Sequence, residues 1–556
     1  MTNKTPGGVP TSHIDTFASD NMPPVESLPI FDYSNTPELS NYPDYLNVAT
    51  EILDKAIDDG FGDKRAVALG DVGWTYLELL DTANRIAEVL TEDCGLVSGN
   101  RVLLRAPNTP MLVAAWFGVI KAGGICVTTM PLLKARELQA PIERAKVSIA
   151  LCDQDLAEEM KIAADSSSTI KHLLYFSRVG SLDQESTLEI ACKKKTGKFN
   201  NVKTAADDIA IIAFTSGTTG QPKGAMHFHR DIMATTDTCG LSITKVTPRD
   251  IITGTPPLAF TFGLGGLMIF PLRFGASIQF LESPYPEQIL STIEKYKVTQ
   301  IYTAPTAYRA MLDLVQDFDI SSLWQGVSAG ETLPKSTWES FYKATGIRLI
   351  DGLGSTEMFH IFISKPPEEM RPGYTGSAIP GYRARIFDDK GKAVEPGIPG
   401  FLAVQGPTGC KYIDDPERQK NYVKNGWNYP GDIYEMSKDG YLKYVARADD
   451  MIVSSGYNIS GPEVEAILLE HELVSECAVI ASPDPDRGNL VKAFVVLRDR
   501  AQSSDNLVAE LQEFVKASIA PYKYPRAIEF VKELPKTQTG KLQRYRLRQL
   551  EVKDTS

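Results

Sequence analysis

The sequence lacks the features that mark a membrane-bound, disulfide-bonded or zinc-binding protein. Its seven cysteines, at positions 94, 126, 152, 192, 239, 410 and 477, form no CxxC pair and are odd in number, so neither a zinc site nor a disulfide framework is predicted. The N-terminal segment has no apolar signal-peptide core, and the longest apolar stretches, such as 267–272, are too short to span a bilayer. These absences predict a soluble protein of the reducing cytoplasm, without a membrane partner.

Positive charge is also scarce, since 58 Lys and Arg residues face 70 Asp and Glu residues and the formal net charge is -12. Without a basic surface the chain cannot release many counterions from a phosphate backbone, which argues against nucleic acid as a partner. Small anionic ligands remain compatible with local basic pockets. The hydrophobic fraction of 43% supports a full globular core, and 556 residues predict three or four units, or fewer large ones, at about 150 residues each.

What the sequence does contain is a stretch rich in glycine and hydroxyl groups, FTSGTTGQPKG at 214–224. It follows the apolar run AIIAF, which is typical of a buried strand, and we expect a helix after it. Glycine lets backbone amides approach an anion, hydroxyls add donors and Lys223 supplies a positive charge, so the stretch can wrap phosphates. Pro222 stands where the phosphate-loop pattern GxxxxGK[ST] requires glycine, which weakens a kinase or GTPase interpretation. A flexible surface linker of this composition is the alternative, although linkers rarely follow a buried strand directly.

The chain upstream of this stretch has two parts. Residues 1–42 are rich in Pro, Ser, Asp and Asn, which predicts an extended arm that either lies on the surface or is partly disordered. Helical periodicity follows, and Thr75 with Glu78 predicts a capping box at the start of the second helix. Strands and helices then alternate to about residue 370, a pattern typical of parallel βαβ units.

The pattern changes twice in the rest of the chain. After about residue 372, short runs bounded by turn signals predict the antiparallel hairpins of a smaller β-rich subdomain. From Asp449 onward the pattern indicates a compact α+β domain of about a hundred residues, in which Ser460 and Glu463 predict another capping box. The predicted fold class is therefore α/β, with a large N-terminal domain, 1–448, of α/β subdomains plus the β-rich subdomain, and a small mobile C-terminal domain, 449–556.

Five segments resemble, in order, the motifs of the adenylate-forming superfamily, which includes acyl-CoA synthetases, firefly luciferases and peptide-synthetase adenylation domains. The first is the stretch at 214–224. The others are DGLGSTE at 351–357, preceded by SAGE at 328–331; NYPGDIY at 428–434; ARADDMIVSSGYNISGPEVE at 446–465; and LPKTQTGKLQR at 534–544. Each motif alone is weak, because a GxG turn, a GD pair or a GK pair is common in proteins that use it only structurally. Together they cover most of the chain and are far more specific.

The resemblance implies an ATP site with a magnesium ion. Glu357 is implied as the magnesium ligand, and Lys541, Thr356 and Glu357 as the catalytic residues, because a hard cation suits the approach of an anionic carboxylate to a triphosphate. Lys541 would contact the acyl carboxylate and the α-phosphate, where negative charge builds up. The implied ATP-binding residues are Thr215, Ser216, Gly217, Thr218, Thr219, Gly220, Lys223, Ser328, Ala329, Gly330, Glu331, Asp351, Gly352, Asp432 and Arg447.

The same resemblance implies a reaction in two steps. An acid attacks ATP to give an acyl-AMP and pyrophosphate, the C-terminal domain then rotates about a hinge at Asp449, and coenzyme A attacks the acyl-AMP. Gly456 and Tyr457 are implied as CoA-binding residues. The sequence departs from the family pattern at Pro430, where a Thr or Ser is usual, and at Ala446, where glycine is usual.

Finer resemblance narrows the family to aryl-CoA ligases. PPLAFTFGLGG at 256–266 and STEMFHIF at 355–362 are similar to benzoate-CoA ligases, whereas SHIDTFASDNMPP at 12–24 and HFHRD at 227–231 are similar to 2-aminobenzoate-CoA ligases. His227 and His229, near the first motif, are interpreted as structural caps or core residues. By position, the residues that would line a flat, apolar aryl slot are Thr261, Phe262, Gly354, His360 and Ile361.

The predicted function is therefore an ATP-dependent ligase that joins a 2-aminobenzoate-type or benzoate-type acid to coenzyme A, with ATP, Mg²⁺ and CoA as cofactors. One alternative is an adenylating enzyme that passes the acyl group to a carrier-protein thiol. Another is a nucleotide-binding regulatory protein that has lost catalysis, against which the presence of Lys541, Glu357 and Asp432 argues. The oligomeric state stays open, with a homodimer as one alternative.

Overall fold

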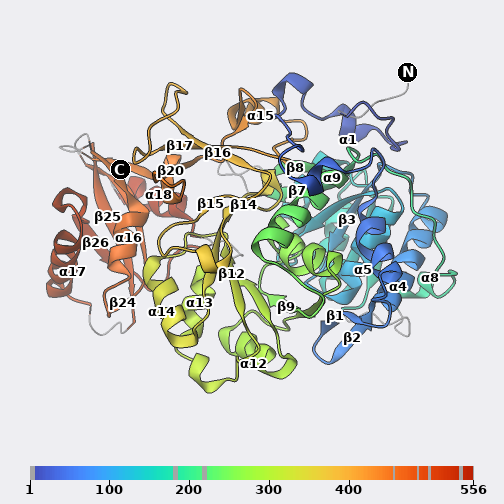
Figure 1. Ribbon diagram of the computed structural model, residues 1–556, viewed down its shortest axis with the longest axis horizontal. Helices are drawn as coiled ribbons and strands as arrows, with labels where there is room; N and C mark the ends of the chain where they lie inside the picture. The colour runs from blue at the N-terminus through green and yellow to red at the C-terminus, as the bar shows by residue number, and fades with distance from the viewer. Residues whose placement is uncertain are drawn as a thin grey trace.

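The structure is a computed structural model that describes residues 7–178, 186–215, 222–454, 457–484, 488–498, 503–536 and 542–554. In Figure 1 the first sheet, built from the N-terminal part of the chain, and the C-terminal domain lie at opposite sides. The segments coloured green and yellow, which form much of a second sheet, lie between them. This mixed α/β architecture confirms the predicted fold class.

The first sheet is formed by strands between residues 101 and 228, within the part of the chain in which the sequence predicts alternating strands and helices. Within the described residues its strand order is β6-β5-β3-β4-β7-β8, and every pair is parallel except β7 with β8. The strands are β3 (Arg101–Arg105), β4 (Ile125–Thr129), β5 (Ile149–Asp153), β6 (His172–Phe176), β7 (Ile209–Thr215) and β8 (Lys223–Phe228). The helices are α4 (Tyr76–Glu88), α5 (Pro110–Lys121), α6 (Ala135–Ala145), α7 (Ala157–Asp165) and α8 (Thr187–Cys192).

Two helices of this part show how the sequence specifies its packing. Helix α4 begins with the predicted capping box, since the Thr75 side chain accepts from the Glu78 amide and the Glu78 carboxylate accepts from the Thr75 amide. Every residue of α5 is buried, which fits a helix that is apolar all round and lies inside the molecule.

The segment after the glycine-rich stretch differs from the prediction. We expected a helix, but Lys223–Phe228 forms β8, which pairs with β7 from Ile209 opposite Phe228 to Thr215 opposite Lys223. Helix α9 (His229–Thr235) begins only afterwards. The prediction failed because most of β8 is buried on both faces, and a short buried strand lacks the alternation that would distinguish it from a helix.

The second sheet has the strand order β15-β14-β13-β12-β11-β9-β10-β1-β2 within the described residues. The strands from β13 to β1 in this order are parallel to one another, and antiparallel pairs complete both edges. The strands are β1 (Arg65–Leu69), β2 (Val72–Thr75), β9 (Ile251–Gly254), β10 (Ser277–Phe280), β11 (Gln300–Thr303), β12 (Gln325–Ala329), β13 (Leu349–Gly354), β14 (Ile361–Ser364) and β15 (Ser377–Ala378). The helices are α10 (Thr261–Leu264), α11 (Phe270–Arg273), α12 (Pro286–Tyr296), α13 (Pro305–Met311) and α14 (Lys335–Thr345).

The β-rich subdomain is antiparallel, as its turn signals predict. The strands are β16 (Arg383–Phe387), β17 (Gly400–Gln405), β18 (Val423–Lys424), β19 (Trp427–Asn428), β20 (Asp432–Met436) and β21 (Leu442–Arg447), with α15 (Pro416–Tyr422) before β18. The N-terminal arm is tied to this subdomain, because the amides of Ile30 and Asp32 donate to the carbonyls of Gly426 and Gly406. The short helices α1 (Phe17–Asp20) and α2 (Pro37–Ser40) also lie in the described part of the arm.

The C-terminal part has an α+β core of its own, built from side chains between Ile452 and Phe530. Its elements are β22 (Met451–Ser454), β23 (Tyr457–Ser460), α16 (Gly461–Leu468), β24 (Val474–Asp484), β25 (Gly488–Leu497), α17 (Asp505–Ser518), β26 (Ala527–Phe530) and α18 (Arg544–Asp554). Only half of the predicted capping box forms: Ser460 accepts from the Glu463 amide, but the Glu463 carboxylate binds Lys523 instead, at 2.7 Å. None of the helices in the described ranges is long and apolar enough to cross a membrane.

Candidate active site

The carboxyl ends of β12 and β13 bring two of the predicted motifs side by side. Ser328 pairs with Asp351 and Ala329 with Gly352 across these parallel strands. The Ser328 hydroxyl oxygen is buried and has no hydrogen-bond partner among the described residues, so it can bind a ligand that reaches it. Gly330, with φ at 89°, then turns the chain out of the strand. In open α/β sheets ligands bind beyond such strand ends.

Asp351 lies within β13, which continues to Gly354, so both glycines of DGLG are part of the strand. Its side chain is only 7% exposed, and burial raises the pKa of the carboxyl group to about 8, although hydrogen bonds from the Gly352 amide and Thr375 act in the opposite direction. At neutral pH the Asp351 carboxyl group therefore holds its proton and can both donate and accept a hydrogen bond.

A tight turn links β13 to β14 and contains Thr356 and Glu357. Ser355 caps a 3-10 turn, Thr356–Met358, through its side chain, which accepts from the Met358 amide at 3.3 Å. The turn ends at Phe359, which has φ at 73° and ψ at -53°. These angles are strained for a residue with a side chain and are typical of functional sites. Nothing in the sequence predicts this strain.

The Glu357 carboxylate is fixed by a residue that the sequence analysis missed. The Tyr412 hydroxyl donates to Glu357 Oε1 at 2.5 Å, and both side chains are buried. Lys223, the first residue of β8, places its ammonium 5.8 Å from the centre of the Tyr412 ring. Tyr412 therefore hydrogen-bonds one predicted site residue and lies within cation–π range of another, from a different motif. The sequence holds no signal for it, because a lone tyrosine in a β-rich segment is typical of a core residue.

His227 contacts the same turn from the other side. Its Nε2 lies 2.7 Å from the Thr356 carbonyl, to which it donates. Burial lowers the pKa of His227, so its ring is neutral at physiological pH. His227 thus supports Thr356 from β8, beyond the cap or core role that we predicted for it. His229, by contrast, accepts from the Val48 amide at 3.3 Å inside the core, as a structural histidine would.

Asp432 and Arg447 lie opposite each other on neighbouring strands of the β-rich subdomain. They are paired residues of β20 and β21, and Arg447 Nη1 donates to Asp432 Oδ1 at 3.1 Å. The same nitrogen donates to the carbonyl of Pro430 at 2.9 Å. Although Pro430 supplies no hydroxyl, its carbonyl orients the guanidinium group. A carboxylate held in this way is suited to accept hydrogen bonds from a ribose.

Aromatic rings pack against His360, one of the residues predicted to line an aryl slot. His360 is 2% exposed, and its ring centre lies 5.6 Å from that of Phe262 and 4.6 Å from that of Phe270. A Cβ atom at Gly354 would lie 2.7 Å from the His360 carbonyl oxygen, so a larger residue there would displace this turn. Thr261 is buried beside Phe262 at the start of α10. The side chain of Ile361 packs against Gly352, beneath the strand end.

The electrostatics of His360 define its chemistry. Burial lowers the pKa of His360 to about 3, so the ring is neutral across the physiological range. Its Nε2 lies 3.3 Å from the Phe262 carbonyl, which can only accept, so Nε2 carries the proton. Nδ1 is therefore an acceptor, and it is buried without a hydrogen-bond partner among the described residues.

Some predicted residues lie outside the described residues: Ser216, Gly217, Thr218, Thr219, Gly220, Gly456 and Lys541. Thr215 and Lys223, which flank the glycine-rich loop, are the last and first residues of paired strands. Asp449 lies in a 3-10 turn, Ala448–Asp450, between β21 and β22, and Tyr457 begins β23. The predicted hinge is thus a turn between two subdomains.

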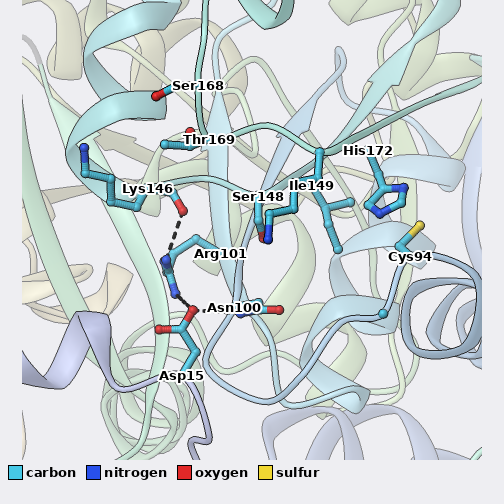
Figure 2. A pocket seen from close by; sticks show the side chains of 12 residues that line it. Asp15, Cys94, Asn100, Arg101, Lys146, Ser148, Ile149, Ser168, Thr169 and His172 are labelled. Atoms are coloured by element: carbon cyan, nitrogen blue, oxygen red, sulfur yellow. Dashed lines mark hydrogen bonds and ion pairs between the residues drawn. The ribbon is translucent and has the colours of Figure 1, made fainter.

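A separate cavity of about 310 Å³ lies where Arg101, Ile149 and His172 begin β3, β5 and β6. Figure 2 shows Arg101 in this cavity, where it binds Asp15 and the carbonyl of Lys146. None of the described residues that line it belongs to the predicted site. Because it lies at the amino-terminal ends of the strands, and Asp15 balances the Arg101 charge, we exclude it from the candidate site.

Residues 55–411 match the family model of AMP-binding enzymes, and residues 463–541 match that of the AMP-binding enzyme C-terminal domain. The chain therefore belongs to the AMP-binding enzyme family. This confirms the resemblance of its motifs to the adenylate-forming superfamily. It is 33% identical over 529 residues to the benzoate-CoA ligase of Thauera aromatica, covering 94% of this chain and 99% of the relative. It is also 32% identical over 531 residues to the human mitochondrial acyl-coenzyme A synthetase ACSM3, covering 92% and 90%.

Solved structures agree with these relatives. The anthranilate CoA ligase AuaEII, crystallised with anthranoyl-AMP, superposes with a TM-score of 0.88 at 32% identity, covering 93% of this chain and 99% of that one. A benzoate CoA ligase from Burkholderia xenovorans LB400 superposes with a TM-score of 0.82 at 30% identity, covering 90% and 100%.

Proposed function

We propose that this protein is an ATP-dependent aryl-CoA ligase whose acid is of the 2-aminobenzoate or benzoate type. In the first step a carboxylate oxygen attacks the α-phosphorus of ATP, and pyrophosphate leaves as the aryl-AMP forms. In the second step the sulfur of coenzyme A attacks the aryl carbonyl, AMP leaves, and the thiol proton is released. The relatives named above include ligases for both acids, which supports this substrate class.

The observation that carries the choice of acid is the buried acceptor on His360. The His360 ring packs against the rings of Phe262 and Phe270, and its Nδ1 has no hydrogen-bond partner among the described residues. An unpaired buried acceptor costs about 1–3 kcal/mol, so a ligand that donates to it gains free energy. The ortho amine of 2-aminobenzoate can donate one hydrogen to its own carboxylate and the other to Nδ1. Benzoate fits the same apolar walls but leaves the acceptor unpaired.

The residues at the phosphate end fit ATP with Mg²⁺. Mg²⁺ in nucleotide sites is held by one or two carboxylates together with phosphates and water. Glu357 supplies one such carboxylate, and the described residues contain no group of three or more potential metal-binding side chains that would suggest an all-protein cage. When bound, the ion would neutralise phosphate charge as pyrophosphate departs. Asp432 would hold the ribose, and Ser328 would bond the nucleotide at the β12 strand end.

The C-terminal domain would serve both steps by rotating about Asp449. We propose that Lys541 acts in the first orientation and that Gly456 and Tyr457 line the CoA path in the second. In the orientation described here, Arg309 on α13 donates to the carbonyls of Leu469 and Val474, at 3.4 and 3.0 Å. A large rotation would require these two bonds to break, so they favour the present orientation.

Half-reactions test this function most directly. The protein would be incubated with ATP, Mg²⁺ and either benzoate, 2-aminobenzoate or hexanoate, with and without CoA, and the products followed by mass spectrometry. We expect aryl-AMP without CoA and aryl-CoA with it. Lys541→Ala should lose aryl-AMP formation by orders of magnitude but keep the thioester step from supplied aryl-AMP, because the lysine acts only in the first step. An equal loss in both half-reactions would contradict the role of Lys541.

A second candidate function is activation of an aliphatic acid, which the similarity to the acyl-coenzyme A synthetase ACSM3 favours. A short fatty acid would leave part of a ring-shaped slot empty, which costs about 25 cal/mol for each Å² of apolar contact not made. Hexanoate turnover above that of both aromatic acids would establish this alternative. If the acceptor is a carrier-protein thiol instead of CoA, the protein should form aryl-AMP but should not convert CoA to aryl-CoA.

A further inference from the structure

A short extended segment, residues 410–413, lies along β8 and joins two parts of the site. The Met226 amide donates to the Lys411 carbonyl at 2.8 Å, and the Ile413 amide donates to the Gly224 carbonyl at 2.9 Å. The segment therefore lies beside β8 and adds a third hydrogen-bonded segment to the β7–β8 hairpin. Successive side chains on an extended segment point to opposite sides, so Lys411 and Tyr412 face different surroundings.

Lys411 faces the interior and anchors the segment. Its ammonium lies 2.7 Å from Asp231 Oδ2 and 3.0 Å from the Gly409 carbonyl, and neither charged side chain is exposed to solvent. The ammonium also lies 4.4 Å from the centre of the Phe228 ring. Such a buried charge pair has one well-defined geometry, because either charge alone would be strongly destabilised there.

Asp231 also caps the helix that follows β8 and lies near His227. Its Oδ2 accepts from the Phe228 amide at 3.0 Å at the start of α9, and it lies 3.7 Å from His227 Nδ1. His227 in turn donates to the Thr356 carbonyl at 2.7 Å. The Lys411–Asp231 pair therefore anchors the segment that carries Tyr412, whereas His227 contacts the Thr356 carbonyl independently of this pair.

Tyr412 faces the site and lies close to two groups of opposite charge. Its hydroxyl donates to Glu357 at 2.5 Å, and its ring lies 5.8 Å from the Lys223 ammonium. No ion pair joins Lys223 to Glu357, both of which belong to the described residues.

We propose that Tyr412 is a positioning residue that orients Glu357 toward the nucleotide-bound cation and keeps Lys223 apart from it. The hydroxyl satisfies one carboxylate oxygen with a neutral donor, which leaves the negative charge for the metal ion. The ring occupies the space through which Lys223 would otherwise reach Glu357. The Lys411–Asp231 pair holds Tyr412 in this place. This inference rests on the proposed function, because it gives Glu357 and Lys223 their partners in that reaction.

The test compares Tyr412→Phe with the parent in a direct binding measurement. Mn²⁺ replaces Mg²⁺, α,β-methylene-ATP replaces ATP so that no reaction occurs, and free Mn²⁺ is counted by electron paramagnetic resonance. Loss of a partner that orients a metal-binding carboxylate weakens metal binding by about 10- to 100-fold. We expect Tyr412→Phe to fall at the lower end of this range. Tyr412→Leu, which also removes the ring, should weaken binding further because Lys223 can then reach Glu357.

A matched control separates positioning from general destabilisation. The buried Tyr76 hydroxyl donates to the Ala276 carbonyl at 2.7 Å, away from the site, so Tyr76→Phe loses a comparable hydrogen bond. Both Phe variants should melt slightly below the parent, and only Tyr412→Phe should lose Mn²⁺ affinity. A folded Tyr412→Phe variant whose Mn²⁺ affinity stays within about twofold of the parent overturns the proposal, since a supporting partner is expected to change it by tenfold or more.

Measurements of the two half-reactions distinguish a failure of the proposed ligase function from a failure of the positioning role of Tyr412. Tyr412→Phe should slow aryl-AMP formation and leave the thioester step from supplied aryl-AMP unchanged. If the parent makes no aryl-CoA but Tyr412→Phe still weakens Mn²⁺ binding, the proposed function fails and the positioning role stands. If the parent is active and Mn²⁺ binding does not change, the positioning role fails alone.

Discussion

The two ends of the candidate site are built on different physical principles. At the phosphate end, Lys411 and Asp231 form a fully buried ion pair, and Tyr412 holds Glu357 by a hydrogen bond of 2.5 Å. At the acyl end, the rings of Phe262 and Phe270 pack around His360, which burial keeps uncharged. Charge and hydrogen bonds set the geometry at one end, whereas shape sets it at the other.

This difference follows from what each end would have to bind. The triphosphate and its cation would be the same for every acid, so their partners can be fixed by strong, directional contacts. The acid offers a flat apolar ring and at most one polar substituent, so discrimination there rests on packing and a single acceptor. Variants at the phosphate end should therefore have the larger effects, and variants at the acyl end should change selectivity.

The largest expected effect is on stability at the phosphate end. Lys411→Met should lower the free energy of unfolding by about 3–5 kcal/mol, because it leaves the Asp231 carboxylate buried without its counter-charge. The double variant Asp231→Asn with Lys411→Met should recover about half of this loss or more, since no unpaired charge remains. Urea denaturation followed by tryptophan fluorescence measures both.

An exposed pair provides the control for this comparison. Lys161 and Asp165 are also 2.7 Å apart, but their side chains are 66% and 64% exposed. Lys161→Met should change stability by less than about 0.5 kcal/mol, because exposed pairs are screened by water. If Lys161→Met and Lys411→Met cost the same, burial is not what makes the Lys411–Asp231 pair important.

The next effect is a pH dependence that comes from Asp351. Its pKa is raised from 3.8 to about 8 in the folded protein, so the folded state binds an extra proton between these values. The stability that this carboxyl contributes is fully present below pH 3.8 and is lost as the pH rises through about 8. The loss is at most about 1.4 kcal/mol per pH unit. Asp351→Asn should remove this dependence, so the variant should gain stability relative to the parent between pH 5 and pH 8.5. Melting curves at several pH values measure this, and parallel curves for the two proteins would contradict the raised pKa.

At the acyl end, added volume should affect acid binding more than nucleotide binding. A Cβ atom at Gly265 would lie 2.4 Å from His360 Cδ2, so Gly265→Ala must displace the ring. Overpacking costs about 1–3 kcal/mol, and we expect kcat/KM for 2-aminobenzoate to fall by about tenfold with little change in the KM for ATP. Removing the ring in the double variant Gly265→Ala with His360→Ala should restore part of the activity toward benzoate. A tenfold change in the KM for ATP would mean that Gly265 acts on the nucleotide instead.

The smallest effect concerns selectivity between the two aromatic acids. His360→Ala removes the buried acceptor, so the preference for 2-aminobenzoate over benzoate should shrink by about 1 kcal/mol, which is several-fold in the ratio of kcat/KM values. Phe262→Leu is the matched control, because it removes an apolar wall and should lower kcat/KM for both acids alike. An unchanged ratio in His360→Ala would exclude this residue from the ortho contact.

Motifs supplied the candidate site residues, and topology explains how some of them come together. SAGE and DGLGSTE could be recognised as local patterns, and the parallel pairing of β12 with β13 then brings Ser328 beside Asp351. The strand β8 was mistaken for a helix because its burial hides the period-two alternation. The half-formed capping box at Ser460 arose because Lys523, distant in sequence, binds Glu463. Local rules cannot anticipate a partner of that kind.

By itself, the sequence determined the succession of α/β units, the β-rich hairpins and the family, because periodicity, turn residues and motif spacing are local properties of the chain. Only the tertiary structure decided that Lys411 meets Asp231, 180 residues away in sequence, and that Tyr412 meets Glu357, 55 residues away. It also decided that His360 is left with one unpaired acceptor. These features depend on burial, which withdraws charges and polar atoms from water and makes each partner, or its absence, energetically decisive.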